Sequence, residues 1–397
     1  MLESNTEFLV PEIMDVIRAF GREQDTFVHY FSYSGGNIFN SIQYDGVFYD
    51  FTEECSEEDP IVAKRLVKRY TKLAFYLVLS QRYGDLPWGA LTGIRPLKLA
   101  RMEQREGRDF EALFNKLHVS SANTELCRRI MTTQGEAYKA GGQDIYVSLP
   151  FCPTKCEYCS FITAPIEKTR SYVQPYLECL VREIYSLKPI LQDVRSVYVG
   201  GGTPFVLSAQ DLSKVYAAIR DVMPGSYEFT VEAGRPDVFT DEKLAVSQEF
   251  GVNRICVNPQ SFLDETLVKI GRKHTAAQTI EAYEMARKYD MDINLDLIAG
   301  LADETPADFA YSVNKAIELR PENITVHTLS LKSGSRLKEE TKRLFISGIT
   351  DMIAYAREAL TAAGYDPYYL YRQKYQAGGL ENTGWTLPGK VCIYNVD

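Results

Sequence analysis

Three cysteines stand close together near the middle of the chain, within residues 151–161. Three residues separate Cys152 from Cys156, and two separate Cys156 from Cys159. Three thiolates on one loop can hold three corners of a cubane four-iron four-sulfur cluster, which leaves the fourth iron open. An open metal position lets a site bind and activate a ligand, as it does in catalytic zinc sites. The spacing therefore predicts a catalytic 4Fe–4S cluster.

A zinc site or purely structural thiols are the alternatives. Zinc sites usually combine two CxxC pairs or add a histidine, and the nearest histidines, His118 and His274, are distant in sequence. The other cysteines are scattered, which argues against a disulfide framework and suits a reducing compartment. They are Cys55, Cys127, Cys179, Cys256 and Cys392.

Other residues of chemical interest follow short apolar segments. The glycines of Gly200–Thr203 would allow a ligand to approach the backbone, because no Cβ stands in the way. The carboxylate of Glu232 can accept charge-assisted hydrogen bonds. Gln260, Arg272 and Asp296 add further polar groups. The alternatives are a tight turn for the glycines and ordinary salt bridges for the charged residues.

The pattern of apolar residues explains how these positions come together. From about residue 143, short apolar strands alternate with longer amphipathic helices, as in βαβ units. We expect strands at residues 144–149, 196–199, 228–232, 254–258, 292–297 and 323–328, and helices at 172–187, 212–222, 276–289 and 307–318. Right-handed crossovers then predict an α/β fold, a partial (β/α)6 TIM-like barrel, with the polar positions at the carboxyl ends of its strands. Ligands bind at that edge in such folds.

The rest of the chain predicts flanking domains. We expect an N-terminal α+β domain over residues 1–140, with a small antiparallel sheet at 27–51 and a helix at 61–82. The core barrel would span 141–335. A helix at 351–363 and an aromatic segment at 365–375 would begin a C-terminal domain over 336–397. Because residues 393–397 read as the middle of a strand, we expect that domain to be truncated.

Charge and composition narrow the class of partner. The formal net charge of -9 argues against a broad nucleic-acid surface, because phosphate binding needs clustered Lys and Arg. No stretch is long and apolar enough to span a membrane, and the acidic N-terminus lacks the features of a secretory signal. We therefore expect a cytoplasmic protein that acts on a small molecule.

The cysteine loop resembles that of the radical S-adenosylmethionine (SAM) superfamily, in which the same CxxxCxxC spacing follows the first strand of a partial barrel. The resemblance implies a 4Fe–4S cluster on Cys152, Cys156 and Cys159, and SAM as the second cofactor. Tyr158 would pack near the adenine, and Gly201, Gly202 and Thr203 would contact the amino-acid end of SAM. The other implied SAM contacts are Tyr146, Glu232 for the ammonium group, Gln260 and Asp296 for the ribose, and Arg272 for the carboxylate.

The order of these motifs resembles the oxygen-independent coproporphyrinogen III oxidase branch. That branch usually has a histidine two residues after the tyrosine that aligns with Tyr146, and Ser148 stands there instead. Residues 87–96, followed by Lys98, are similar to a hallmark of the HemZ-type coproporphyrinogen dehydrogenases. Trp88 and Arg95 in that segment have a functional or a domain-packing role.

This resemblance implies a reaction and its partners. SAM would be cleaved by one electron to a deoxyadenosyl radical, and propionate groups of coproporphyrinogen III would become vinyl groups with loss of carbon dioxide, giving protoporphyrinogen IX. A reduced flavodoxin or ferredoxin would supply the electron. Lys332, Arg336 and Arg170 could meet the substrate carboxylates, but their spacing assigns them nothing. A haem chaperone without decarboxylase activity, or a radical SAM enzyme with another substrate, are the rival functions.

Overall fold

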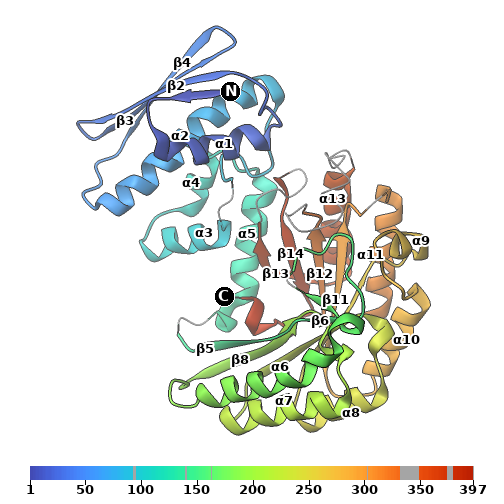
Figure 1. The fold of residues 1–397 in the computed structure, drawn as a ribbon. Coiled ribbons are helices and arrows are strands. Elements are labelled where there is room, and N and C mark those ends of the chain that lie inside the picture. The colour runs from blue at the N-terminus through green and yellow to red at the C-terminus, as the bar shows by residue number, and fades with distance from the viewer. Residues whose placement is uncertain are drawn as a thin grey trace. The chain divides into compact units, whose positions relative to one another are not determined.

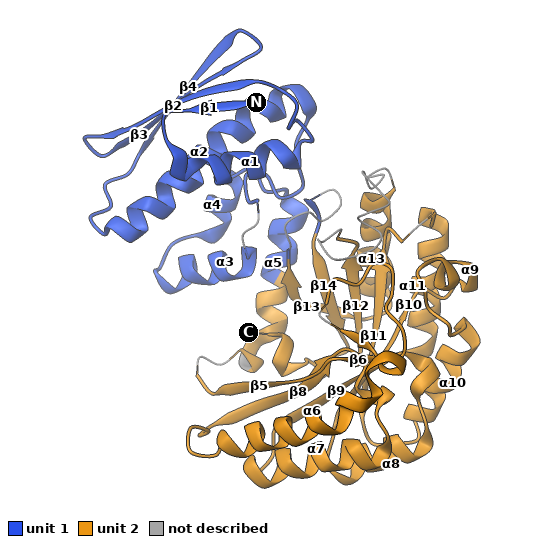
Figure 2. Ribbon diagram, in the orientation of Figure 1, with its two compact units in different colours: residues 1–128, 372–374, 378–380 blue, residues 129–371, 375–377, 381–397 orange. Residues whose placement is uncertain are grey.

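The computed structural model describes residues 1–92, 95–138, 141–161, 163–301, 303–330, 348–372 and 379–396. The chain divides into two compact units (Figure 2). Unit 1 comprises residues 1–128 with short segments at 372–374 and 378–380, and unit 2 comprises residues 129–371, 375–377 and 381–397. No helix in these described ranges is long and apolar enough to cross a membrane.

Unit 1 combines a small sheet with helices (Figure 1). The strands are β1 Leu2–Ser4, β2 Phe27–Ser34, β3 Asn37–Tyr44 and β4 Val47–Glu54. They lie in the order β1–β2–β3–β4, and β2, β3 and β4 run antiparallel, which confirms the predicted sheet. The helices are α1 Val10–Ala19, α2 Pro60–Tyr83, α3 Pro96–Arg105, α4 Phe110–Lys116 and α5 Ser121–Gln134, the last of which continues into unit 2. The Asp59 side chain accepts hydrogen bonds from two amides at the start of α2, the helix predicted at 61–82.

The segment at residues 87–96 also belongs to unit 1. Trp88 is buried, and the Arg372 guanidinium lies 5.2 Å from the centroid of its ring. Gly89 has a φ of 51°, and an added Cβ would lie 2.1 Å from the Leu117 carbonyl oxygen. Trp88 therefore has a packing role within this unit. Arg95 is exposed just before α3, and residues 93 and 94 lie outside the described ranges.

Unit 2 is built on a parallel sheet that curls into a half-barrel (Figure 1). Its parallel strands are β5 Gln143–Leu149, β8 Val194–Gly201, β9 Glu228–Gly234, β10 Arg254–Gln260, β11 Asp292–Ala299 and β12 Asn323–Thr328. They are neighbours in chain order. Each predicted strand lies inside an observed one, so the partial (β/α)6 barrel is confirmed. The helices are α6 Ile166–Ser186, α7 Ala209–Val222, α8 Asp241–Glu249, α9 Asp264–Lys269, α10 Ala276–Ala286, α11 Pro306–Leu319 and α13 Ile349–Ala362.

Side chains alternate sharply between the two faces of this sheet. The outward residues, which the helices cover, are apolar and fully buried; examples are Val199, Val231 and Leu295. The inward residues of the same strands are mostly polar. Counted along each strand from its amino end, the first inward residues are Asp144, Ser196, Glu228, Arg254, Asp292 and Asn323, the second are Tyr146, Tyr198, Thr230, Cys256, Asn294 and Thr325, and the third are Ser148, Gly200, Glu232, Asn258, Asp296 and His327; we call these sets the lower, middle and upper layers. The strands are staggered, so that Arg254 is in register with Thr230 and Asn323 with Asn294. The interior is therefore polar at every level.

The C-terminal residues continue the same sheet. Strand β14, Asn382–Thr386, runs antiparallel to β12, and β13, Asp366–Tyr371, runs antiparallel to β14. The domain boundaries predicted near residues 140 and 335 stay predictions, because residues 139, 140 and 331–347 lie outside the described ranges. Lys332 and Arg336 lie there too, whereas Arg170 is an exposed residue of α6.

The prediction that residues 393–397 form a strand is wrong for the described part, 393–396. Ile393–Asn395 is a short 3-10 turn, η6. The Glu228 carboxylate accepts hydrogen bonds from the amides of Ile393, at 2.9 Å, and Tyr394, at 3.1 Å. These amides are satisfied by a side chain, so the segment needs no neighbouring strand.

Arg254 is the main connection between the lower layer and the C-terminal segment. It is 4% exposed, pairs with Glu228 at 3.4 Å and Asp292 at 3.3 Å, and donates to the carbonyls of Lys390 and Val391 at 3.1 and 3.3 Å. Its NH1 group also donates to Asn323.

Replacing Arg254 with Met should destabilise unit 2 strongly. The change leaves the buried Glu228 carboxylate without its cation, which typically costs about 3–5 kcal/mol, whereas Asp292 keeps its pair with Lys390. Denaturant unfolding followed by circular dichroism would measure the loss. Lys315→Met is the matched control, because Lys315 lies at the surface of α11, where it pairs with Glu318 and lies over the Tyr311 ring. Equal effects of the two changes would contradict the role given to Arg254.

Candidate functional site

The cysteine loop begins where the first barrel strand ends. Cys152 lies in the short strand β6, Phe151–Cys152, which pairs with β7, Ala164–Pro165. The Glu157 amide donates to the Ile270 carbonyl at 3.1 Å, which ties the loop to the segment after α9. Cys152 and Cys156 are buried and Cys159 is partly exposed. Burial raises the pKa of the Cys152 and Cys159 thiols, so metal binding must displace their protons.

Gly202 allows the cysteine loop to lie against the end of β8. An added Cβ would lie 2.4 Å from the Phe151 carbonyl oxygen and 2.9 Å from the Cys152 sulfur. The amide of Gly202 donates to Leu149, and that of Thr203 to Phe151, both at 2.8 Å. The Thr203 hydroxyl donates to the Cys152 sulfur at 3.6 Å. The glycine run thus holds the first predicted cluster ligand in place.

Tyr158 and Arg272 form the next part of the site. The Tyr158 ring packs against an apolar cluster at the carboxyl edge of the sheet, which includes Ile298 and Leu329. Arg272 is buried and donates to the Tyr158 hydroxyl at 2.9 Å and to the Asn258 carbonyl. The cysteine loop and the edge of β10 are therefore joined through one guanidinium.

Two carboxylates meet in the upper layer. Glu232 accepts a hydrogen bond from the Asn258 amide at 3.3 Å, and Asp296 accepts one from Asn294 at 2.8 Å. Burial raises the pKa of Glu232 to about 8, and the nearby charge of Asp296 adds to this effect. A cation at this point would offset both the burial of Glu232 and its repulsion by Asp296.

Tyr146, Gly201 and Gln260 complete the predicted set. The Tyr146 hydroxyl and Glu232 Oε2 both crowd Gly200: an added Cβ there would lie 3.1 Å from the first and 2.8 Å from the second. Gly201 has a φ of 106°, and an added Cβ would lie 2.7 Å from the Ser148 hydroxyl. Gln260 ends β10, buried, with a φ of 71° that is unfavourable for a residue with a Cβ.

These residues fit the predicted cofactors. The donor set offers three thiols on one loop, and the described residues contain no group of three His, Cys, Asp or Glu side chains arranged around a single metal ion. The Asn258 side-chain oxygen and the Arg272 Nε are buried without a hydrogen-bond partner. Such atoms usually have one, so these two positions suit a polar ligand.

Four residues beside this site were not among the predicted site residues: His327, Tyr371, Tyr198 and Asn258. His327 Nε2 lies 3.8 Å from Asp296 Oδ2, and its Nδ1 lies 3.3 Å from the Tyr371 hydroxyl. Tyr198 and Asn258 flank Glu232. Polar residues at every second position of β9, β10 and β11 were a signal that could have identified Asn258.

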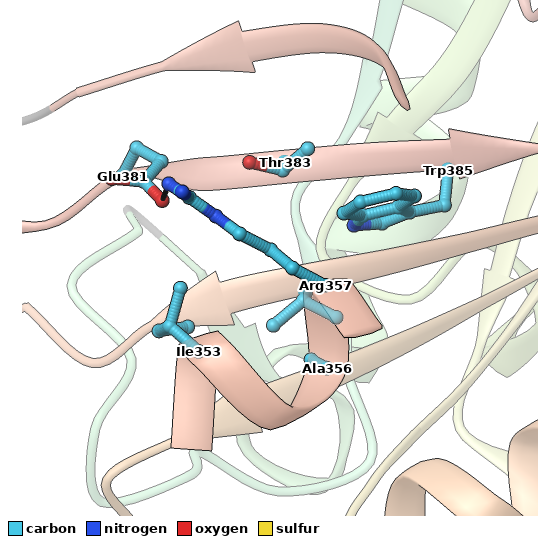
Figure 3. A pocket seen from close by; sticks show the side chains of 7 residues that line it. Ile353, Ala356, Arg357, Glu381, Thr383 and Trp385 are labelled. Carbon is cyan, nitrogen blue, oxygen red and sulfur yellow. Dashed lines mark hydrogen bonds and ion pairs between the residues drawn. The ribbon is translucent and has the colours of Figure 1, made fainter. Parts of the chain in front are cut away.

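A pocket on the helix-covered face is not a candidate for the substrate site. It lies between α13 and strands β12 and β14, with a volume of about 10 Å³, roughly enough for one water molecule (Figure 3). The buried ion pair between Arg357 and Glu381 crosses it. Its role is packing.

Comparisons with known proteins agree with this geometry. Residues 146–316 match the model of the radical SAM superfamily. The chain is 38% identical over 347 residues to the oxygen-independent coproporphyrinogen-III oxidase-like protein HemZ of Bacillus subtilis. This alignment covers 81% of this chain and 68% of that protein. It is 33% identical over 259 residues to the heme chaperone HemW of Lactococcus lactis, which covers 63% of this chain and 64% of that protein.

A solved structure shows the same fold. Coproporphyrinogen III oxidase HemN of Escherichia coli superposes with a TM-score of 0.55 at 21% sequence identity, covering 67% of this chain and 59% of that one. The chain thus spans between 59% and 68% of the length of these relatives. It belongs to the radical SAM superfamily, whose members use a 4Fe–4S cluster and SAM, and falls in the coproporphyrinogen oxidase branch of that superfamily.

Proposed function

We propose that this chain carries out the oxygen-independent oxidative decarboxylation of coproporphyrinogen III to protoporphyrinogen IX. The observation that carries the proposal is the similarity to the HemZ protein, which extends over 81% of the chain and so well beyond residues 146–316. The polar upper layer and the thiol loop supply a suitable cofactor site.

The residues of the site would divide the work as follows. When bound, the cluster and SAM supply one-electron cleavage of a sulfonium bond and hence a carbon radical. Cys152, Cys156 and Cys159 would hold the cluster. Glu232 would pair with the ammonium group of SAM, and Arg272 with its carboxylate.

The remaining contacts would fix the nucleoside and the methionine backbone. Asp296 and Gln260 would accept hydrogen bonds from the ribose hydroxyls, and Tyr158 would pack on the adenine. Tyr146, Gly201, Gly202 and Thr203 would line the methionine end.

The cysteines and the one-electron chemistry indicate the cellular compartment and the electron donor. Apart from the triplet, the cysteines are scattered along the sequence, which suits a reducing compartment, so we place the protein in the cytoplasm. A reduced flavodoxin or ferredoxin would deliver the electron.

A haem chaperone is the second candidate function. The similarity to HemW, at 33% identity over 63% of the chain, favours it specifically. In that case haem would bind in a fixed ratio to the chain, and no carboxylate would be lost. Haem titration followed by absorbance separates the two functions.

The first test is turnover. Protein reconstituted anaerobically with iron and sulfide, then given dithionite, SAM and coproporphyrinogen III, should yield deoxyadenosine and decarboxylated tetrapyrrole by mass spectrometry. Cys156→Ala should abolish both products. Cys179→Ala should leave both unchanged, because Cys179 is an exposed residue of α6. Deoxyadenosine without decarboxylation would refute the proposed substrate while keeping the radical chemistry.

Gly202→Ala should lower the iron bound per chain several-fold. The added Cβ overlaps the Phe151 carbonyl, which is backbone and cannot turn away, so the loop carrying Cys152 must shift. Iron and sulfide analysis after reconstitution measures this. Gly225→Ala is the comparison variant: its φ of 120° strains an alanine, but nothing lies within 4 Å of the added Cβ, so it reports the effect of backbone strain away from the cysteine loop. Full iron content in Gly202→Ala would show that the loop tolerates the shift.

Glu232 should make stability depend on pH. Burial raises its pKa from the usual 4.5 to about 8 in the folded chain, so the folded state binds the proton more tightly than the unfolded state. Its contribution to stability is then complete below about pH 4.5 and is lost as pH rises to about 8, with a slope of up to about 1.4 kcal/mol per pH unit.

Glu232→Gln should remove that slope. Unfolding of the cluster-loaded protein without SAM, measured from pH 5 to 8, should show the variant gaining stability relative to the wild type as pH rises. It should also bind SAM more weakly, because an amide cannot neutralise a cation. Parallel pH curves for the two proteins would mean that the carboxyl group is ionised in the folded state.

A further inference from the structure

The segment from Lys390 to Val396 lies inside the half-barrel and is fastened to its lower layer. Beside the bonds to Glu228 and Arg254, Lys390 pairs with Asp292 at 2.8 Å, and its carbonyl accepts from Asn323 at 3.0 Å. The Cys392 thiol donates to Glu228 at 3.2 Å. We call residues 390–396 the plug. Figure 1 shows this red segment near the C label, beside β5 and β8.

The plug presents one aromatic ring to the middle layer. Tyr394 stacks on Tyr198, with ring centroids 4.5 Å apart and planes at 26°, and lies 6.2 Å from Tyr146 at the same angle. Tyr146 and Tyr198 are partners across β5 and β8, and their own centroids are 5.9 Å apart. The three rings are therefore mutual neighbours between the plug and the sheet, with Tyr394 stacked most closely on Tyr198.

The upper side of these rings borders the acidic group of the cofactor site. Glu232 Oε2, the Tyr198 ring and the Tyr146 hydroxyl all converge on Gly200, within 2.8 to 3.1 Å of an added Cβ. Tyr146 is 49% exposed, so β5 alone does not fix its ring. Stacking fixes it, because aromatic pairs have a preferred separation and orientation.

We propose that Tyr394 is a positioning residue for the SAM site, which acts by holding Tyr146 and Tyr198 against Glu232. The inference rests on the proposed binding of SAM at this edge. It gives the plug a role in cofactor affinity in addition to its role in closing the barrel.

The test compares three substitutions in the full, cluster-loaded chain: Tyr394→Phe, Tyr394→Leu and Tyr394→Ala. Calorimetric titration with SAM, without reductant or tetrapyrrole, gives each dissociation constant. Tyr394→Phe keeps the stack and should bind within about twofold of the wild type. Tyr394→Leu, which fills the space without a ring, and Tyr394→Ala should bind about tenfold more weakly, as expected for loss of an aromatic pair.

Iron content and thermal midpoint are measured on the same samples. Unchanged affinity in Tyr394→Leu and Tyr394→Ala would overturn the proposal, as would a loss of affinity that only follows a loss of iron or of folding. Failure of the wild type to bind SAM would overturn the cofactor site and this inference with it. Failure of decarboxylation alone would affect only the proposed substrate.

Discussion

The polar inner face of the half-barrel is the constraint on which the rest of unit 2 depends. Buried polar groups need partners, and a sheet that carries Glu228, Arg254 and Asp292 in one layer cannot leave them facing each other alone. In the lower layer the plug supplies these partners: its backbone amides and carbonyls bond to Glu228 and Arg254. In the upper layer Glu232 and Asp296 stay close together, and under the proposed function the ammonium group of SAM would supply their cation.

The close carboxylates of the upper layer lower the stability of the cofactor-free protein. Glu232 is held in a site that opposes its ionisation, so the features that suit it to a cationic ligand weaken the fold near neutral pH. The glycines beside Glu232 provide the space that this arrangement needs. Gly200 leaves room for Glu232 and the tyrosines, and Gly202 leaves room for the cysteine loop, so the glycine run brings cofactor ligands from two elements to one strand end.

Local pattern predicted much of unit 2, because strands 144–149 to 323–328 are short, apolar and separated by amphipathic helices. The cysteine triplet was evident for the same reason: its ligands are neighbours in sequence. The plug was mispredicted because Ile393 to Val396 alternates like a strand, while the group that captures its amides, Glu228, is 165 residues earlier. His327 was missed although the predicted strands 292–297 and 323–328 pair directly and place it near Asp296. Tyr371 was missed because it reaches His327 only through the antiparallel pairing of β13 with β14 and of β14 with β12.

Relatives of this chain are named as an oxidase-like protein and as a haem chaperone, so one fold serves more than one function. The upper-layer residues from Ser148 to Asp296 lie within residues 146–316, the region that matches the superfamily model, and His327 lies outside it. Residues that distinguish the branches should therefore lie outside it. Ser148 is the exception inside that region, and His327 and Tyr371, beside Asp296, are the first such residues after it.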